Sequence, residues 1–430
     1  MADFTFTPIS NSNGPYKLFV ESSINDAGTV AFEGIQSYCE SIGGDCLQVG
    51  TTTPPAAIFT GNGNGSTTTI IDKSSYGGFS GYNSATFFAP SINNAGTTAF
   101  AASVYNSGQL VVPGPTAVLS GSGGPINTVA YSSQPFSFAL VNPNGNPNDF
   151  SNYGAAGNFV TAAIINNAGT VAYVKGQNGE TGIYSTTRGG ATTTIADTSG
   201  PLSNFYNGGF FVTRNANPFS AYTLPDINDQ GTVAFNATLD TGGRGIFTGN
   251  GQQTTKIADT SEGFTYFSSP SINDSGTLAF NAGLNTGDSA IFASTDGKLT
   301  TIADTSGSFS SFRSDVAINE LGKVAFLADL DNNSRGLFTG SKDLGFKEVI
   351  AVGDTLGGST VTQLRISRNG LNDAGQIAFD AVLADGSQSI FRAEPVPEPS
   401  DGIISVLALA IFSMVGYRWR RRIRFAKHTR

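Results

Sequence analysis

The sequence predicts an all-β fold, and three observations lead to that class. Glycine is frequent, at 54 of 430 residues, while charged residues make up only 13% of the chain. Thr, Ser, Asn and Phe are abundant and residues 1–400 show no long helical periodicity, which favours short strands separated by many turns. One pattern, Asn-x-x-Gly-x-x-Ala followed by an aromatic residue, recurs seven times. These repeats indicate one large repeat domain rather than two or three ordinary domains.

The recurring pattern predicts a tight turn that leads directly into a strand. Its Asn can bond its own backbone and its Gly suits a positive φ, as a short turn between two strands requires. The Ala then permits close approach of neighbouring sheets, and each aromatic ring fills the space between them, contributing roughly 2 to 3 kcal/mol. The functional alternative is that the seven turns line one face and bind a ligand or Ca²⁺. The Asn residues are Asn25, Asn93, Asn166, Asn228, Asn273, Asn319 and Asn372.

Two further patterns complete each repeat. A small-aliphatic-aromatic run, such as that at 290–292, begins 16 or 17 residues after the Asn in the last five repeats, and 32 and 24 residues after it in the first two. An Ile-Ala-Asp run ends 31 residues after the Asn, at Asp197, Asp259 and Asp304. The regular place of these aspartates indicates a turn or cap, because a catalytic carboxylate pair normally breaks the repeat symmetry.

With the run that enters the Asn turn, each repeat has four strands in about 45 residues, which is typical of a propeller blade. The sequence therefore predicts a seven-bladed β-propeller of four-stranded antiparallel blades over residues 1–393. The seventh repeat lacks its own outer strand, because 31 residues beyond Asn372 lies Ile403, inside a distinct tail. We expect residues 4–10 to supply that strand and close the last blade, which hides two edges that would otherwise invite aggregation.

The charge distribution argues against nucleic acid as a partner. Seven of the 23 basic residues and one of the 32 acidic residues lie in 401–430, which leaves 16 basic and 31 acidic residues in 1–400. That excess of acid repels phosphate backbones, and no basic stripe is present. The lone His428 and the lone Trp419 also lie in the tail. Residues 1–400 therefore hold neither a histidine-activated nucleophile nor a histidine-containing zinc site.

Two short segments are candidates for covalent or metal chemistry. Cys39 and Cys46 are separated by six residues in a Gly-containing segment, and we expect a disulfide between them, since two thiolates without His make only half of a metal site. Asp329, Asp331 and Asn333 match the opening of a calcium loop, with Ser in place of the sharp-turn Gly. That run fits either a Ca²⁺ site or a polar hairpin, and no other cofactor is expected.

The C-terminal tail has three parts in a fixed order. A Pro-rich linker over 394–402 contains Pro-Glu-Pro, an apolar run begins the segment 403–430, and arginines follow it. The apolar run is short for a span of ~20 residues, but in a tilted or thinned bilayer it could insert as a helix, with the arginines in the cytoplasm. These parts resemble the PEP-CTERM sorting signal of exported bacterial proteins. The matching residues are Pro397, Glu398, Pro399, Arg420, Arg421 and Arg422.

The resemblance implies export from a Gram-negative or cyanobacterial cell. It also implies an exosortase, a membrane protease, as a partner that removes the tail when the protein reaches the cell surface or the exopolysaccharide matrix. Before processing, the hydrophobic helix would hold the chain at the inner membrane; the alternative is an ordinary membrane anchor. Members of that family begin with a secretory signal peptide, whereas the first residues here lack a basic start and an apolar run, so we expect a truncated start.

The seven repeats also resemble the tandem NxxGxxAF family of exported bacterial proteins, which is defined by its repeat rather than by an activity. We predict a monomeric, non-catalytic propeller at the cell surface or in the matrix, structural or binding exopolysaccharide through its polar, acidic loops. The alternative is a carboxylate-dependent polysaccharide hydrolase or lyase. We expect specific function where the repeat is broken, in the loops 33–56, 103–116, 132–163 and 199–225.

Overall fold

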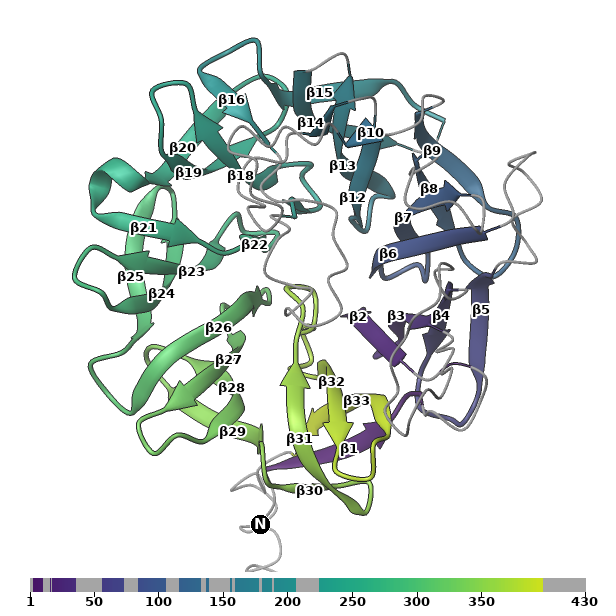
Figure 1. Ribbon diagram of the computed structural model, residues 1–430, viewed down its shortest axis with the longest axis vertical. Coiled ribbons are helices and arrows are strands. Elements are labelled where there is room, and N and C mark those ends of the chain that lie inside the picture. The colour runs from purple at the N-terminus through teal and green to yellow at the C-terminus, as the bar shows by residue number, and fades with distance from the viewer. Residues whose placement is uncertain are drawn as a thin grey trace, which may run out of the picture. The chain divides into compact units, whose positions relative to one another are not determined.

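A computed structural model shows the chain as a series of short antiparallel strands that forms a seven-bladed β-propeller (Figure 1). Cys39, Cys46 and the sorting signal from Pro397 onwards lie outside the residues that the structure describes, so the predictions made for them stay predictions. The described residues are 3–10, 16, 18–35, 56–72, 84–105, 116–132, 137–138, 155–156, 159–177, 180–187, 189–205 and 224–396.

Each blade is a separate sheet, and in blades one to six its strands follow one another in chain order from the centre of the propeller to its rim. Blade one comprises β2 (Leu18–Ile24), β3 (Val30–Ile35), β4 (Ala56–Gly61) and β5 (Thr67–Ile71). Blade two comprises β6 (Ser84–Ile92), β7 (Thr98–Tyr105), β8 (Thr116–Gly121) and β9 (Asn127–Ser132). Blade three comprises β12 (Phe159–Ile165), β13 (Thr170–Gln177), β14 (Glu180–Thr187) and β15 (Thr192–Asp197). A two-stranded sheet pairs β10 (Ser137–Phe138) with β11 (Ala155–Ala156).

In blades four and five, two short strands share the inner position. These blades comprise β16 (Leu202–Asn204), β17 (Asp226–Ile227), β18 (Val233–Leu239), β19 (Arg244–Gly249) and β20 (Thr254–Asp259); and β21 (Phe264–Phe267), β22 (Ser271–Ile272), β23 (Leu278–Leu284), β24 (Ser289–Thr295) and β25 (Lys298–Asp304), with the 3₁₀ turn η1 (Thr260–Glu262) between them. Blade six comprises β26 (Phe309–Ile318), β27 (Val324–Leu330), β28 (Arg335–Ser341) and β29 (Gly345–Ala351).

The last blade is completed by the start of the chain. Its strands are β30 (Thr355–Leu356), β31 (Ser359–Arg365), β32 (Ile377–Leu383) and β33 (Gln388–Pro395), and β1 (Phe4–Pro8) pairs with β33 as the outermost strand. The Ile9 main-chain N–H extends this pairing to the Ile390 carbonyl (2.8 Å). The prediction that residues 4–10 close the propeller is confirmed.

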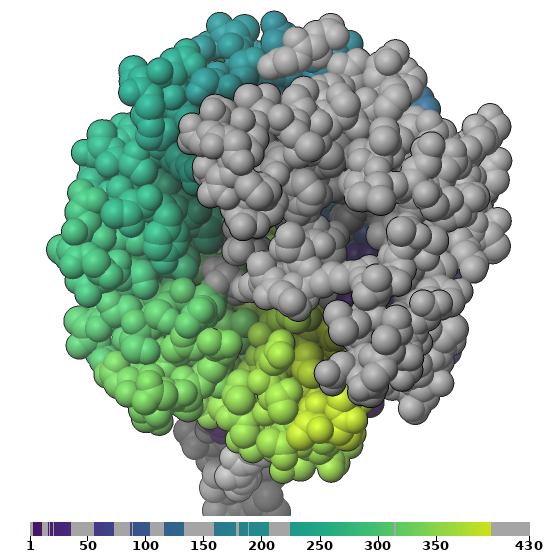
Figure 2. All heavy atoms as spheres, in the orientation of Figure 1, coloured from purple at the N-terminus to yellow at the C-terminus, as the bar shows by residue number. Residues whose placement is uncertain are grey.

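The hydrophobic core lies between adjacent blades. In blade five, Phe280 of the repeat pattern stacks on its cross-strand partner Phe292, with ring centroids 5.9 Å apart, and both belong to one buried cluster with Ala234 of blade four. On the other face of the same blade, the fully buried Ala279 packs against Phe326 of blade six. The small Ala and the large Phe therefore have the packing roles predicted from the sequence. In Figure 2 the neighbouring blades coloured from teal to yellow lie in contact with one another.

The chain divides into two compact units. Residues Phe6–Glu394 form the larger one, and the described part of the smaller one is Asp3–Thr5 with Pro395 and Val396, where the Val396 N–H bonds to the Asp3 carbonyl (3.0 Å). No helix in the described part of the chain has the length and apolar character needed to cross a membrane.

Candidate functional site

The repeated Asn turns are built alike in all seven blades. In blade one, the Asn25 N–H bonds to the Thr29 carbonyl (3.0 Å), and the Thr29 N–H bonds back to Asn25 Oδ1 (2.9 Å). Gly28 donates to the Asn25 carbonyl at a φ of 74°, a backbone conformation that favours glycine. The turn predicted from the sequence is confirmed, with the Asn side chain serving as a backbone partner.

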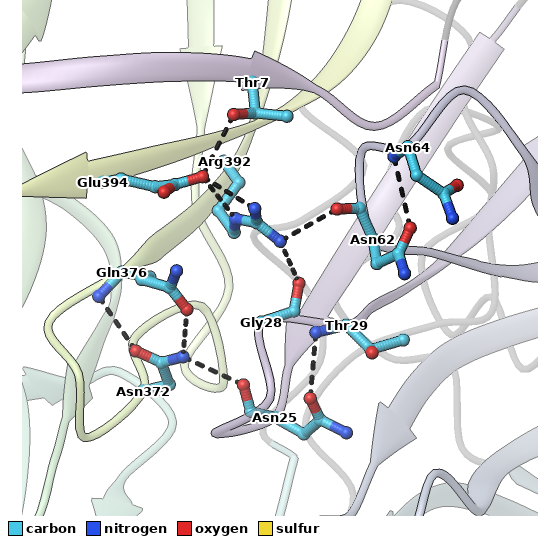
Figure 3. A network of polar contacts seen from close by, with 10 residues as sticks. All are labelled: Thr7, Asn25, Gly28, Thr29, Asn62, Asn64, Asn372, Gln376, Arg392 and Glu394. Carbon is cyan, nitrogen blue, oxygen red and sulfur yellow. Dashed lines mark hydrogen bonds and ion pairs between the residues drawn. The ribbon is translucent and has the colours of Figure 1, made fainter.

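The same Asn side chains also link the blades to one another. Each Nδ2 group donates to the main-chain carbonyl of the equivalent Asn in the next blade, at 2.8–3.3 Å. Asn372 of blade seven donates to Asn25 of blade one (Figure 3), and this bond closes the ring. We call it the Asn girdle; its buried members are Asn25, Asn93, Asn166, Asn228, Asn273, Asn319 and Asn372. Because the amides bond within the protein, the girdle is architectural.

The residue after each girdle Asn forms a second closed ring. Its side-chain oxygen accepts the N–H of the equivalent residue in the preceding blade, as Asp26 accepts from Asp373 (3.0 Å). Burial raises the pKa of Asp274 to about 6, and the neighbouring carboxylates of Asp229 and Glu320 add to the rise. We call this the carboxylate ring; its members are Asp26, Asn94, Asn167, Asp229, Asp274, Glu320 and Asp373.

A polar clamp strengthens the junction between the last and first blades (Figure 3). Arg392 of β33 donates to the carbonyls of Gly28 and Asn62 in blade one. Glu394 accepts from Arg392 Nη2 (2.7 Å) and from the Thr7 hydroxyl of β1 (3.0 Å). The hydrogen bonds from Arg392 hold the pKa of Glu394 below its usual value.

A buried charge cluster reaches across the centre of the propeller. Arg368, shortly before the Asn turn of blade seven, is 5% exposed, and its carbonyl accepts from Ser271 Oγ of blade five (3.4 Å). Burial lowers the pKa of Arg368, while the charges of Asp226, Asp315 and Glu21 oppose that shift. Burial raises the pKa of all three carboxyl groups, and Arg368 opposes the rise. The cluster joins blades one, four, six and seven; Arg368 and Asp226 are buried, whereas Glu21 and Asp315 are half-buried.

An open cleft of about 630 Å³ lies between blades five and six. Its residues come from the starts of β21, β24 and β26 and from the end of β23, so it lies at the strand ends opposite the Asn turns. Nine of the twelve lining residues carry a hydroxyl, amide or carboxylate group, and no Lys, Arg or His occurs in the described lining. Among the lining residues are Tyr266, Asn285, Asp288, Ser310, Ser311 and Asp331.

Tyr266 presents an aromatic ring to this cleft. The ring lies against Gly283, where a Cβ would come 2.3 Å from Tyr266 Cε1, so the glycine allows the close approach. The Tyr266 hydroxyl donates to Asn281 Oδ1 (3.4 Å), and 41% of the residue remains exposed. In blade three the equivalent Phe159, which pairs with Gly176, is 3% exposed. Tyr266 is therefore an exposed form of an aromatic residue that is buried elsewhere in the repeat.

Two carboxylates line the cleft from neighbouring blades. Asp288 of blade five accepts hydrogen bonds from the hydroxyls of Thr286 (2.8 Å) and Thr305 (3.4 Å). Asp331 of blade six donates its main-chain N–H to the Ser308 carbonyl (3.1 Å), and its side chain is exposed. The cleft thus has negative charge on both sides.

The other residues proposed as calcium ligands lie in a hairpin. Asp329 Oδ2 is 2.6 Å from Arg313 Nη2, and Asp329 Oδ1 is 2.6 Å from Arg335 Nε. Burial acts to raise the pKa of Asp329, but hydrogen bonds from both guanidinium groups hold it below its usual value. Asn333 takes a φ of 65° in the turn. Among the described residues, no group of three or more His, Cys, Asp or Glu side chains is placed to hold a metal ion.

The aspartates that end the Ile-Ala-Asp runs act as turn caps, as predicted. Asp197, Asp259 and Asp304 each accept the N–H of the Ser two residues on, at 2.8–3.0 Å. Each also accepts the hydroxyl of that Ser. Their carboxylates are therefore occupied within their own turns.

Two residues of interest were missed because they stand within regular repeats rather than in inserted loops. Tyr266 occupies the place seven residues before the Asn, where Phe159 and Phe312 stand in other repeats. Arg368 occupies the place four residues before the Asn, where Ala89 stands in the second repeat. The signal for Tyr266 is a hydroxyl added at a position that is Phe in two other repeats. The signal for Arg368 is a charge at a position that is also charged in the first and sixth repeats, as Glu21 and Asp315.

Comparison with known proteins gives a family match and a solved structure of similar fold. The model of a family of unknown function, DUF7453, matches residues 8–258 and 217–403, and no curated protein matches the chain. The acylaminoacyl peptidase of Pyrococcus horikoshii is similar with a TM-score of 0.51 at 10% identity over 91% of this chain and 54% of the peptidase, so the chain spans about half of that protein.

Two further solved structures are similar at lower TM-scores. For the oligogalacturonate lyase of Vibrio parahaemolyticus the TM-score is 0.48 at 11% identity, over 93% of this chain and 98% of the lyase. For YCF48 bound to D1 peptide the TM-score is 0.42 at 11% identity, over 92% and 98% of the two chains. At such identities these likenesses concern the fold alone.

Proposed function

The chain belongs to the family of unknown function DUF7453, and we propose that it is a non-catalytic, polysaccharide-binding β-propeller. The observation that carries this proposal is the cleft between blades five and six, in which the exposed ring of Tyr266 stands among hydroxyl, amide and carboxylate groups. The Asn girdle and the carboxylate ring link blades five and six at the strand ends opposite the cleft.

The chemistry of the cleft suits a sugar. A pyranose ring has an apolar C–H face that packs on an aromatic ring, and hydroxyls that pair with side chains able to donate and accept. Ser310 and Asn285 supply such groups beside Tyr266, and the Ser311 hydroxyl, which donates to Asp329 Oδ2 (2.9 Å), can still accept. The cleft volume of about 630 Å³ lies within the roughly 300–1,000 Å³ of ordinary ligand sites.

The carboxyl groups best suited to donate protons lie away from this cleft, which supports binding over hydrolysis or lyase chemistry. A glycoside hydrolase needs an acid whose pKa is raised, paired with a second carboxylate. Burial raises the pKa of Asp380 to about 7 and that of Glu33 well above its usual value. Neither Asp380 nor Glu33 lines the cleft.

The binding proposal is tested by the change Tyr266→Ala, with Tyr131→Ala as control. Tyr131 is 45% exposed on blade two, so its loss alters a comparable surface outside the cleft. We expect the purified chain to bind oligosaccharides in calorimetry, Tyr266→Ala to weaken binding at least about tenfold, and Tyr131→Ala to leave it unchanged. Absence of binding to neutral, amino and acidic glycans would refute the proposal, and release of reducing ends or unsaturated products would favour the enzyme alternative.

We also propose export to the cell surface or matrix, sorted by the PEP-CTERM signal and processed by an exosortase. The support is the order of Pro397-Glu398-Pro399, the apolar run and Arg420–Arg422 in the sequence. Changing the Pro-Glu-Pro motif to Ala-Ala-Ala in the native host should keep the uncut protein in the membrane fraction, whereas the unchanged protein appears shortened at the surface or in the matrix. Equal distribution of the two proteins would contradict the sorting proposal.

A further inference from the structure

We propose that the cleft between blades five and six selects polysaccharides that carry free amino groups, an inference that rests on the proposed glycan-binding function. Asp288 and Asp331 line the cleft from the two blades, and no cationic side chain occurs in its described lining. A sugar seated on Tyr266 would therefore have carboxylates, and not guanidinium or ammonium groups, as its charged neighbours.

Neither of these two carboxylates is ion-paired with a cation in the described part of the chain. Arg313 and Arg335, the guanidinium groups of blade six closest in sequence to Asp331, both pair with Asp329. Asp288 receives bonds from neutral hydroxyls, which leave its negative charge in place. In the described part of the chain, the Asp331 carboxylate has no hydrogen-bond or ion-pair partner. Both groups are thus available to a ligand's positive charge.

This arrangement discriminates between classes of glycan by charge. The ammonium group of a deacetylated hexosamine forms charge-assisted hydrogen bonds with carboxylates. An N-acetylated sugar of the same backbone keeps the stacking on Tyr266 but loses the ion pairs. A uronic acid brings a third negative charge toward Asp288 and Asp331 and is repelled. The expected order of affinity is amino sugar, then N-acetylated sugar, then uronate.

The test uses calorimetric titration of the full chain with glucosamine, N-acetylglucosamine and galacturonic acid oligomers of matched length. The key variant is Asp288→Asn with Asp331→Asn, which keeps the shape of the cleft and removes both charges. Because the whole chain carries a net charge of −9 and attracts any polycation, the control is Asp240→Asn with Asp343→Asn. Asp240 and Asp343 are exposed and lie outside the cleft. Each double variant removes two negative charges, so the net charge changes equally in both.

We expect the cleft variant to bind the glucosamine oligomer about fivefold to tenfold more weakly, and the N-acetylglucosamine oligomer as the unchanged protein does. The control variant should keep both affinities, and added salt should narrow the difference between the two oligomers. Equal affinity for these oligomers, a preference for galacturonate, or an equal loss in both double variants would overturn the amino-sugar inference. If N-acetylglucosamine still bound through Tyr266, the proposed glycan-binding function would survive that failure.

Discussion

The side-chain amide of Asn372 donates a hydrogen bond of 2.9 Å to the main-chain carbonyl of Asn25, 347 residues earlier in the chain. This bond has the same chemistry as the six that join consecutive blades. The junction of the chain's two ends is therefore one member of a regular series, reinforced by Arg392 and β1.

Replacing Asn372 with Ala should lower the free energy of unfolding by about 1 to 3 kcal/mol. The change removes the donor to the Asn25 carbonyl and the Oδ1 acceptor of the Gln376 N–H, and Asn372 is buried. The matched control is Asn250→Ala, which loses an Asn cap in an exposed turn. Denaturant unfolding measures the free energy of unfolding of both variants. Equally small decreases in the two would show that the girdle bond contributes no more to stability than an ordinary turn.

Replacing Asp274 with Asn should stabilise the protein at pH 8. The pKa of Asp274 is raised from its ordinary value of 3.8 to about 6, so folding favours the protonated side chain. Its contribution to the free energy of unfolding is therefore complete below pH 3.8 and is lost as the pH rises through 6 and the side chain ionises. An amide at this place can accept the Asp229 N–H, as Asn167 accepts from Asn94 in the same ring. The expected gain is about 1 kcal/mol or less, since the group is partly exposed.

Unfolding curves of Asp274→Asn at pH 4 and pH 8 test this expectation, with the exposed Asp343→Asn as control. The gain should be present at pH 8 and absent at pH 4, while the control shows no such change. A gain of the same size at both values would mean that packing, and not the charge of Asp274, is responsible.

Replacing Glu394 with Gln should destabilise the protein at pH 7 by less than about 1 kcal/mol. The pKa of Glu394 is held low, so its contribution is present above its usual value near 4.5 and is lost as the pH falls through the lower, folded value. The variant and the unchanged protein should therefore converge at strongly acidic pH. Glu180→Gln, on an exposed edge, is the control; a deficit that persists in acid would contradict an ionic role for the clamp.

Replacing Gly283 with Ala should weaken glycan binding about tenfold, because its Cβ would come within 2.3 Å of the Tyr266 ring and displace it. Gly307→Ala is the control, since a Cβ there meets nothing within 4 Å and its φ is not positive. Calorimetry measures the affinity for the glycan, and near-UV circular dichroism measures the displacement of the Tyr266 ring. Unchanged binding by Gly283→Ala would show that the position of Tyr266 is unimportant.

The architecture was predictable because spacing along the chain reports it directly. The missing outer strand after Asn372 and the spare strand at residues 4–10 predict the closing pair from spacing alone, and the structure pairs β1 with β33. The girdle was not predictable in the same way. A turn is local, and its Asn was expected to bond its own backbone, whereas the bond from Asn273 to the Asn319 carbonyl depends on how two blades stack.

The cleft also depends on packing between blades. From its sequence neighbours, the run around Asp331 fits either a Ca²⁺ site or a polar hairpin, and neither reading predicts that Asp331 lines a surface with Tyr266 and Asp288 of the preceding blade. Tyr266 occupies a place that is buried as Phe159 in blade three, so the sequence marks the exchange but not its exposure. Exposure is decided by the neighbouring blade.

The Asn girdle holds neighbouring blades together in the same way whatever the number of residues between one girdle Asn and the next. Successive girdle residues are between 45 and 73 positions apart, yet their bonds differ by no more than 0.5 Å. Each bond involves only the turn, so a longer excursion between later strands does not disturb it. Such a frame tolerates divergence: connecting segments can be lengthened or exchanged to meet new ligands while one blade continues to hold the next.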